Sequence, residues 1–153
     1  RRWRGLPPLP LEAPAWPLWF LRVECSVVYG ASGLSKLIDR DWFGGVVTWL
    51  RVVHQEARVR ASILPDWVVD VLVDRDAHRL FAPGIVLTEL FIAVGLWFGR
   101  TRPWALALAI LFHVLIELSS SVETFSFLAI AVLLCLYGPA VAPYLRRRVE
   151  RHG

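Results

Sequence analysis

The amino-acid sequence predicts an all-α membrane protein with four transmembrane helices and with interfacial amphipathic helices between the first and the second. Hydrophobic residues make up 56% of the 153-residue chain, and the mean hydropathy is +0.52, whereas ordinary globular proteins are roughly 45–50% apolar. The chain also holds eight tryptophans, a residue that collects at membrane–water boundaries. The lipid bilayer is therefore the first expected partner.

The first span is predicted at residues 14–38, after a basic, proline-rich arm at residues 1–13. This stretch exceeds the ~20 residues that cross the hydrocarbon layer, but it carries three charged side chains. Steps of three and four residues place five side chains on one face of the helix: Arg22, Cys25, Tyr29, Ser32 and Lys36. A lysine inside a span is costly and marks a functional candidate. The alternative is a lysine whose long stem reaches the headgroups.

The segment from residue 39 to residue 79 is too charged to span, and it predicts interfacial amphipathic helices within residues 42–76. Asp66, Asp70, Asp74 and His78 recur at steps of four and predict a mostly acidic strip. On one helix the ends of that strip lie roughly 18 Å apart, at 1.5 Å per residue. The four side chains therefore cannot bind one metal ion; a solvated face is expected, and no metal site is predicted.

Three further spans are predicted at residues 80–99, 104–118 and 122–142, before a basic tail at residues 143–153. Glu89 lies in the middle of the second span. His113 and Glu117 lie one helical turn apart on one face of the third. Cys25 and Cys135 lie inside apolar runs, where small buried hydrophobes are the simplest interpretation.

Four spans place both ends of the chain on the same side of the membrane. That side carries nine arginines, and the segment at 39–79 carries six, which seven acidic residues offset. Basic residues favour the cytoplasmic side, so we expect cytoplasmic termini and a multi-pass protein of the plasma (cell inner) membrane. The net charge of +4 belongs to these flanks, and no nucleic-acid partner is predicted.

This topology brings Lys36, Glu89, His113 and Glu117 towards one outward-facing cavity beneath the interfacial helices. Burial disfavours the charged form of an amine, and a neutral lysine is a usable general base. A structural ion pair between Lys36 and a carboxylate satisfies the burial of charge equally well. Spacing alone leaves both interpretations open.

Three segments resemble one known family, in the family's order and over roughly residues 16–137. Tyr29-x-x-Ser32-Gly33-Leu34-Ser35-Lys36-Leu37, followed by Asp41-Trp42-x-x-Gly45, resembles the lysine segment of the vitamin K-dependent gamma-carboxylases and of their bacterial relatives, the HTTM (horizontally transferred transmembrane) proteins. Leu87-Thr88-Glu89-Leu90 with the turn Arg100-Thr101-Arg102-Pro103 is similar to the acidic helix that follows. Phe112-His113 with Thr124-Phe125-Ser126-Phe127 resembles the histidine helix and its continuation. Ser35 stands where the carboxylases have a second lysine.

The resemblance implies a carboxylase- and epoxidase-like membrane enzyme, a lyase that uses vitamin K hydroquinone or menaquinol. It implies that Lys36 is the general base and that His113 bonds the quinone or its oxyanion. Tyr29, Ser32, Trp42, Glu89 and Glu117 are then expected at the quinol site, and a protein or small molecule is expected as the acceptor. Two alternatives are a non-catalytic, DoxX-like four-span subunit or scaffold with charges paired inside the bundle, and a transporter module with a relay through Glu89 and His113.

Overall fold

The computed structural model describes residues 15–120 and 124–150, with side chains up to residue 142. Within those ranges the chain is helical and contains no strand, which confirms the all-α class. The arm predicted at residues 1–13 lies outside the described residues. The helices, in chain order, are α1 Trp16–Ile38, α2 Arg40–Phe43, α3 Val46–Val53, α4 Glu56–Arg60, α5 Asp66–Val73, α6 Arg75–Gly95, α7 Arg102–Ser120 and α8 Thr124–Glu150.

Three of the described helices are long and apolar enough to cross a membrane: α6, α7 and the Thr124–Ala142 part of α8. They correspond to the second, third and fourth predicted spans. The first predicted span, α1, has 23 residues, which is a sufficient length. It is not among the three, because Arg22, Glu24 and Lys36 lower its hydropathy. A fourth span at α1 therefore stays a prediction.

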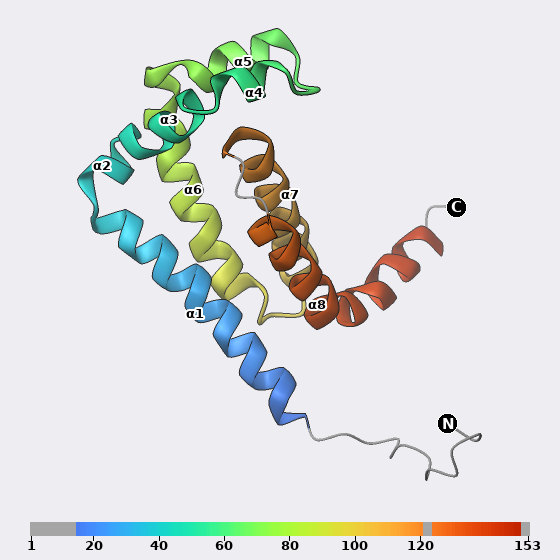
Figure 1. Cartoon of the computed structure of the whole chain (residues 1–153). Helices are drawn as coiled ribbons and strands as arrows, with labels where there is room; N and C mark the ends of the chain where they lie inside the picture. Colours follow the sequence, from blue (N-terminus) through green and yellow to red (C-terminus); the bar gives the residue numbers. More distant parts are fainter. Residues whose placement is uncertain (1–14, 121–123, 151–153) are drawn as a thin grey trace, which may run out of the picture.

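The long helices form a bundle that is closed at one end by the short ones (Figure 1). Helix α1 packs along α6, α6 packs against α7, and α7 packs against α8. Helices α2 to α5, which we call the roof (residues 40–73), lie across the end where α1 finishes and α6 begins. The turn at residues 96–101 lies at the opposite end.

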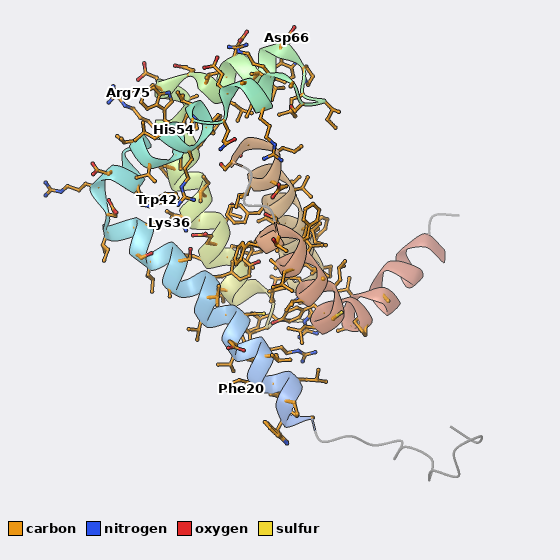
Figure 2. All side chains as sticks on the ribbon, in the orientation of Figure 1. Phe20, Lys36, Trp42, His54, Asp66 and Arg75 are labelled. Carbon is orange, nitrogen blue, oxygen red and sulfur yellow. The ribbon has the colours of Figure 1, made fainter. Side chains whose placement is uncertain are left out.

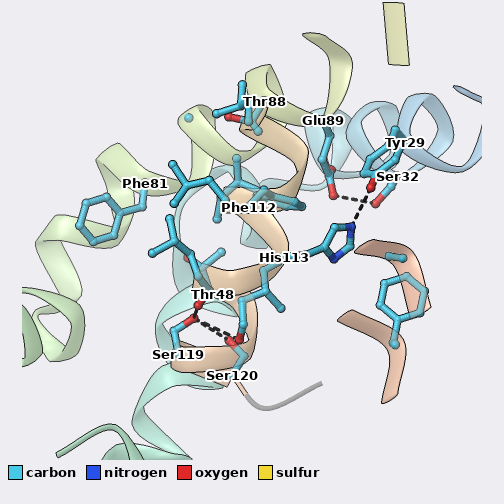
Figure 3. A pocket seen from close by; sticks show the side chains of 18 of the residues that line it. Tyr29, Ser32, Thr48, Phe81, Thr88, Glu89, Phe112, His113, Ser119 and Ser120 are labelled. Atoms are coloured by element: carbon cyan, nitrogen blue, oxygen red, sulfur yellow. Dashed lines mark hydrogen bonds between the residues drawn. The ribbon is translucent and has the colours of Figure 1, made fainter. Parts of the chain in front are cut away.

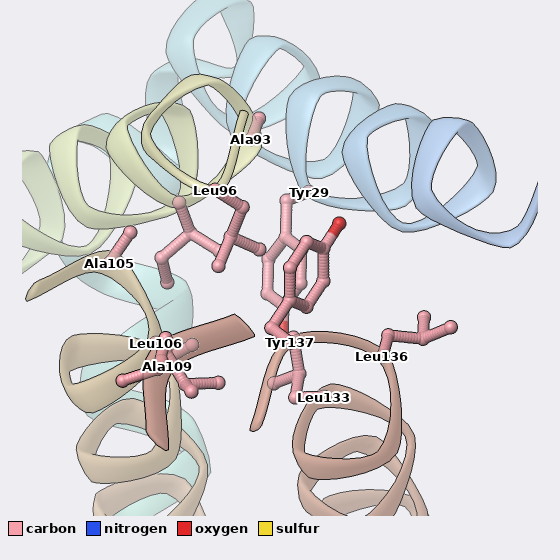
Figure 4. Packing of buried hydrophobic residues seen from close by; sticks show 11 residues of the cluster. Tyr29, Ala93, Leu96, Ala105, Leu106, Ala109, Leu133, Leu136 and Tyr137 are labelled. Carbon is pink, nitrogen blue, oxygen red and sulfur yellow. The ribbon is translucent and has the colours of Figure 1, made fainter. Parts of the chain in front are cut away.

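A close-packed core joins all four long helices (Figure 4). Small residues make the packing possible, since a Cβ added at Gly95 on α6 would lie 3.0 Å from the Cβ of Ala105 on α7. Close contact through small residues is a common mode of helix association in membranes. The buried members are Tyr29, Ile92, Ala93, Leu96, Ala105, Leu106, Ala109, Leu133, Leu136, Tyr137 and Val141.

The roof has its own small core, and its helix α3 packs against α6. Val52, Val59 and Val69 pack together, and Trp49 Nε1 donates to the Val73 carbonyl at 3.0 Å. The pKa of Arg60 is raised because its guanidinium donates to the carboxylates of Glu56 and Asp70.

Gly45 allows the roof to approach α6 closely. Its φ is +80°, and an added Cβ would lie 2.5 Å from the backbone carbonyl of His78. Glycine adopts this left-handed conformation without steric cost. A side chain at this position would therefore push the roof away from the first turns of α6.

The acidic strip predicted from residue 66 to residue 78 is wrong. The chain leaves the helical conformation at Asp74, whose carboxylate instead accepts from the Asp76 N–H and caps the start of α6 at Arg75. An aspartate is a favoured residue at this position. His78 is 3% exposed, its Nε2 pairs with the Leu72 carbonyl at 2.7 Å, and it is not part of a solvated face.

The ends of two long helices also differ from the prediction. Helix α6 spans residues 75–95 rather than 80–99, because the chain turns after Gly95. Helix α8 continues through Pro139 and Pro143 to Glu150, whereas these prolines predicted its end. Figure 1 shows α8 bending away from the bundle towards its C-terminal end. Proline inside a helix removes a hydrogen bond and produces such a bend.

Candidate functional site

A polar face of α1 meets α6 and α7, as the spacing of Tyr29, Ser32 and Lys36 predicts. The helices approach closely here because residue 33 is glycine, and an added Cβ would lie 3.0 Å from the Leu90 side chain. Each of the three side chains finds a partner on a facing helix. The polar groups form two pairs, one around Lys36 and one around Tyr29.

The first pair is an ion pair between Lys36 on α1 and Glu89 on α6. Lys36 Nζ lies 2.8 Å from both Glu89 carboxylate oxygens, and the two side chains are 13% and 7% exposed. Ser32 Oγ donates to Glu89 Oε1 at 3.0 Å and accepts from Lys36 Nζ. Buried charges need such pairing, since removing one partner leaves an uncompensated charge. Lys36 is therefore held against α6 inside the bundle.

Trp42 closes the ion pair from the side of the roof. Lys36 Nζ lies 4.9 Å from the centre of its ring, and the Arg51 guanidinium lies 5.1 Å from the same ring. Cations over an aromatic face are attracted by its negative quadrupole. Figure 2 shows Lys36 and Trp42 where α1 meets the roof.

The second pair is a hydrogen bond between Tyr29 on α1 and His113 on α7. The Tyr29 hydroxyl lies 2.7 Å from His113 Nε2, and the two residues are 8% and 3% exposed. The imidazole makes edge-to-face contacts with the rings of Phe112 and Phe125, whose centres lie 5.7 Å and 5.8 Å away. Its Nδ1 is buried and has no hydrogen-bond partner among the described residues, so its capacity to form a hydrogen bond is unused there.

Both pairs line one large cavity, of about 1130 Å³, shown in Figure 3. Ligand pockets in proteins are typically ~300–1,000 Å³ and mostly apolar, and this wall is built largely of leucine, valine, isoleucine and phenylalanine. Six of the seven residues that the sequence predicts for the site lie in it: Tyr29, Ser32, Lys36, Trp42, Glu89 and His113.

Glu117, the seventh, lies elsewhere. It is not among the residues that line the cavity; instead its Oε1 lies 3.3 Å from Arg58 Nη2 of α4. Its other carboxylate oxygen is buried without a hydrogen-bond partner among the described residues. Glu117 therefore ties α7 to the roof, and the structure does not bring it to Lys36.

The cavity wall also includes polar residues that the sequence did not predict for the site, among them Thr48 and Arg51 of the roof and His78 near the start of α6. His78 Nδ1 lies 3.1 Å from Thr48 Oγ1, which in turn donates to the Gly45 carbonyl at 3.0 Å. The sequence places His78 four residues after the last of three evenly spaced aspartates, and this spacing predicted that His78 would lie on a solvated face. Only the turn at Asp74 directs His78 inward.

The chain was compared with models of known protein families, with curated proteins and with solved structures. A family model described as "HTTM domain" matches residues 10–140. No curated protein matches the chain, and no solved structure matches it.

Proposed function

Because the chain belongs to the HTTM domain family of membrane proteins, we propose that its cavity binds a quinol of the vitamin K hydroquinone or menaquinol class and accepts a proton from it. The observation that supports this most strongly is the joint exposure of two polar pairs to one apolar cavity. Lys36 with Glu89 and Tyr29 with His113 come from α1, α6 and α7 and line the same space.

The residues present fit such a ligand. The apolar wall suits a hydrophobic ring and tail, and the buried, unpartnered Nδ1 of His113 offers a hydrogen bond to a ring oxygen. The ammonium of Lys36 favours a developing negative charge on an oxygen atom, an effect that is strong in a site that excludes water. A bound quinol supplies an acidic hydroxyl group and two electrons.

Lys36 and Glu89 act as one unit in this proposal. A lysine whose Nζ lies 2.8 Å from both oxygens of a carboxylate carries a proton and cannot accept another. It becomes a base after it passes that proton to Glu89, a transfer that low polarity favours because it removes both charges. The amine of Lys36 then takes the hydroxyl proton, and the pair has gained one proton in total.

The same proposal includes the placement in the membrane. In this proposal the protein lies in the plasma membrane, and helix α1 crosses it as a fourth span beside α6. The roof lies in the outer interface, and both termini lie in the cytoplasm. The cavity then opens towards the extracytoplasmic half of the bilayer. Its lining includes the exposed apolar side chains Leu80, Leu111 and Leu115, which suit entry of a lipid-soluble ligand from the side.

One observation favours a non-catalytic subunit as a second candidate. The bidentate contact between Lys36 and Glu89 is the arrangement expected if the two charges only hold α1 against α6. A purely structural pair requires no adjacent space, however, and here the pair lines a cavity of about 1130 Å³. The geometry therefore supports the ligand-binding proposal better.

The test is quinol consumption by the purified protein in detergent, with vitamin K hydroquinone and menaquinol as substrates in air. We expect turnover above the rate of spontaneous oxidation, and a loss of ~10²–10⁴-fold in Lys36→Ala, the usual contribution of a general base. Arg40→Ala is the matched control, since Arg40 is an exposed cation close to the same helix end and does not line the cavity. Equal turnover by wild type and Lys36→Ala would remove the catalytic assignment.

A further inference from the structure

A second group of polar side chains lies at the other end of the bundle, far from the roof, and its centre is Arg22. This arginine is on α1, one helical turn before Ser26. Ser26 Oγ donates to the Ala93 carbonyl at 2.9 Å and accepts from Trp97 Nε1 at 2.6 Å. Arg22 is therefore close in depth to the turn at residues 96–101.

The guanidinium of Arg22 is only partly satisfied. Its Nη2 donates to the Leu136 carbonyl of α8 at 3.3 Å, and its Cζ lies 5.5 Å from the centre of the Tyr137 ring. Its Nε is buried without a hydrogen-bond partner among the described residues. None of the ion pairs found among the described residues involves Arg22.

Tyr137 presents a second unpartnered group beside Arg22. Its ring is 1% exposed, and its hydroxyl is buried with no partner within the described ranges. Figure 4 shows that this hydroxyl points towards α1. Native proteins rarely leave buried polar groups unpaired, and an unpaired N–H and an unpaired O–H on neighbouring side chains of two helices call for an acceptor oxygen.

The surroundings resemble the headgroup level of a membrane protein. The rings of Trp19 and Trp97 are tilted by 33° to each other with their centres 5.6 Å apart, and tryptophan favours that level. Arg100 and Arg102 lie in and just after the nearby turn, and Arg102 donates to the carbonyls of Leu96 and Trp97. This excess of positive charge favours an anionic lipid.

We propose that Arg22 and Tyr137 bind the phosphate of an anionic phospholipid, such as phosphatidylglycerol, where α1 meets α8. The guanidinium and the hydroxyl donate to phosphate oxygens, the Trp19–Trp97 pair packs beside the glycerol region, and the exposed arginine of the turn adds long-range attraction. Guanidinium is well matched to phosphate because its planar fork donates two parallel hydrogen bonds. The site is separate from the Lys36 cavity and does not depend on the quinol proposal.

The experiment measures lipid retention by native mass spectrometry, with the full chain released from micelles that contain phosphatidylglycerol, phosphatidylcholine or no lipid. We expect retention of phosphatidylglycerol in preference to phosphatidylcholine, and a decrease of about tenfold or more in Arg22→Gln, the range of a charged hydrogen bond. Arg22→Lys should keep only part of the affinity, because it keeps the charge and loses the fork. Arg100→Gln, which changes an exposed arginine at the same end, should stay within about twofold of wild type.

Tyr137→Phe tests whether weaker lipid retention results from a lost contact with the lipid or from misfolding of the protein. Removal of an unpaired hydroxyl should not lower the melting temperature in lipid-free detergent, yet it should weaken phosphatidylglycerol retention by about threefold to tenfold, the value of one hydrogen bond. Three results overturn the proposal: unchanged retention in Arg22→Gln, equal retention of the two lipids by wild type, and complete displacement of the lipid by millimolar inorganic phosphate, which would assign the site to a soluble anion.

Discussion

Lys36 is the only lysine of the chain, and its position decides what the bundle can do. Its ammonium is inside the structure, held by Glu89 and Ser32 and covered by Trp42. The contact joins two residues that lie 53 positions apart in sequence, on α1 and α6. At the scale of single residues, the proposed site therefore depends on energetic coupling between Lys36 and Glu89 and on the hydrogen bond between Tyr29 and His113.

A double-mutant cycle measures the first coupling. We expect Lys36→Ala and Glu89→Gln each to lower the free energy of unfolding, because each leaves a partly buried group without its partner. The double variant should recover part of the loss, with a coupling free energy of about 1–3 kcal/mol. Unfolding in mixed micelles of mild detergent and SDS gives these values, and additive losses would show that the two charges do not interact.

Tyr29→Phe tests the second contact. The change removes one buried hydrogen bond to His113 and keeps the aromatic ring in the core, so the protein should lose about 1 kcal/mol of stability. The imidazole then has two unpartnered nitrogens, and quinol affinity should change as well. The same unfolding titration measures the first effect; wild-type stability in Tyr29→Phe would mean that the 2.7 Å contact contributes nothing.

At the scale of elements, the site depends on the close approach of α1 to α6. The sequence predicts a polar face of α1 from the spacing of Tyr29, Ser32 and Lys36, and the structure shows this face packed closely on α6 at Gly33. Helix ends were harder to predict, since they depend on local capping. Asp74 looks like one more acid in a row, and only the conformation of the chain reveals it as the cap of α6.

Gly33→Ala should separate these two helices slightly. Its Cβ would lie 3.0 Å from two atoms of Leu90, and such overpacking costs about 1–3 kcal/mol. Gly138→Ala on α8 is the matched control, because its added Cβ would meet nothing within 4 Å and alanine favours a helix over glycine by about 1 kcal/mol. We expect opposite signs in an unfolding titration; two equal shifts would contradict tight α1–α6 packing.

At the scale of the whole molecule, the open point is whether α1 spans the bilayer. Its composition excludes it from the three spans found by length and hydropathy. The polar face of α1 nevertheless packs against α6. Paired inside the bundle, Lys36 no longer needs contact with water, and the remaining exposed side of α1 is rich in large hydrophobic residues, among them Trp16, Phe20, Val27 and Leu34.

Reporter fusions decide the number of spans. With four spans both termini lie on one side, so alkaline phosphatase should be inactive and green fluorescent protein should be fluorescent when either is fused to the N-terminus or to the C-terminus. With three spans the two ends lie on opposite sides, and each reporter would be active at one end only. A fusion within the roof, for example after Ser62, provides the positive control for the outer side.

Much of this architecture is contained in the sequence, and the remainder depends on tertiary contacts. Hydrophobic runs predict α6, α7 and α8, and spacing by three and four predicts the polar face of α1. His113 and Glu117 lie on one face of α7, as predicted, but the roof captures Glu117 through Arg58. Likewise, Thr48 and Arg51 enter the cavity wall only because the roof folds over the bundle, a long-range event that local pattern does not encode. His78 of α6 enters it because the chain turns at Asp74.

The most direct test of the central claim, that the Lys36–Glu89 pair lines a quinol site, is an anaerobic binding titration. Menaquinol is added to the purified protein while tryptophan fluorescence is recorded, since Trp42 lies against the pair. The account predicts saturable binding by wild type and Arg40→Ala, and an affinity lower by about tenfold or more in Lys36→Ala and Glu89→Gln. Absence of saturable binding, or equal affinity in all four proteins, would contradict it.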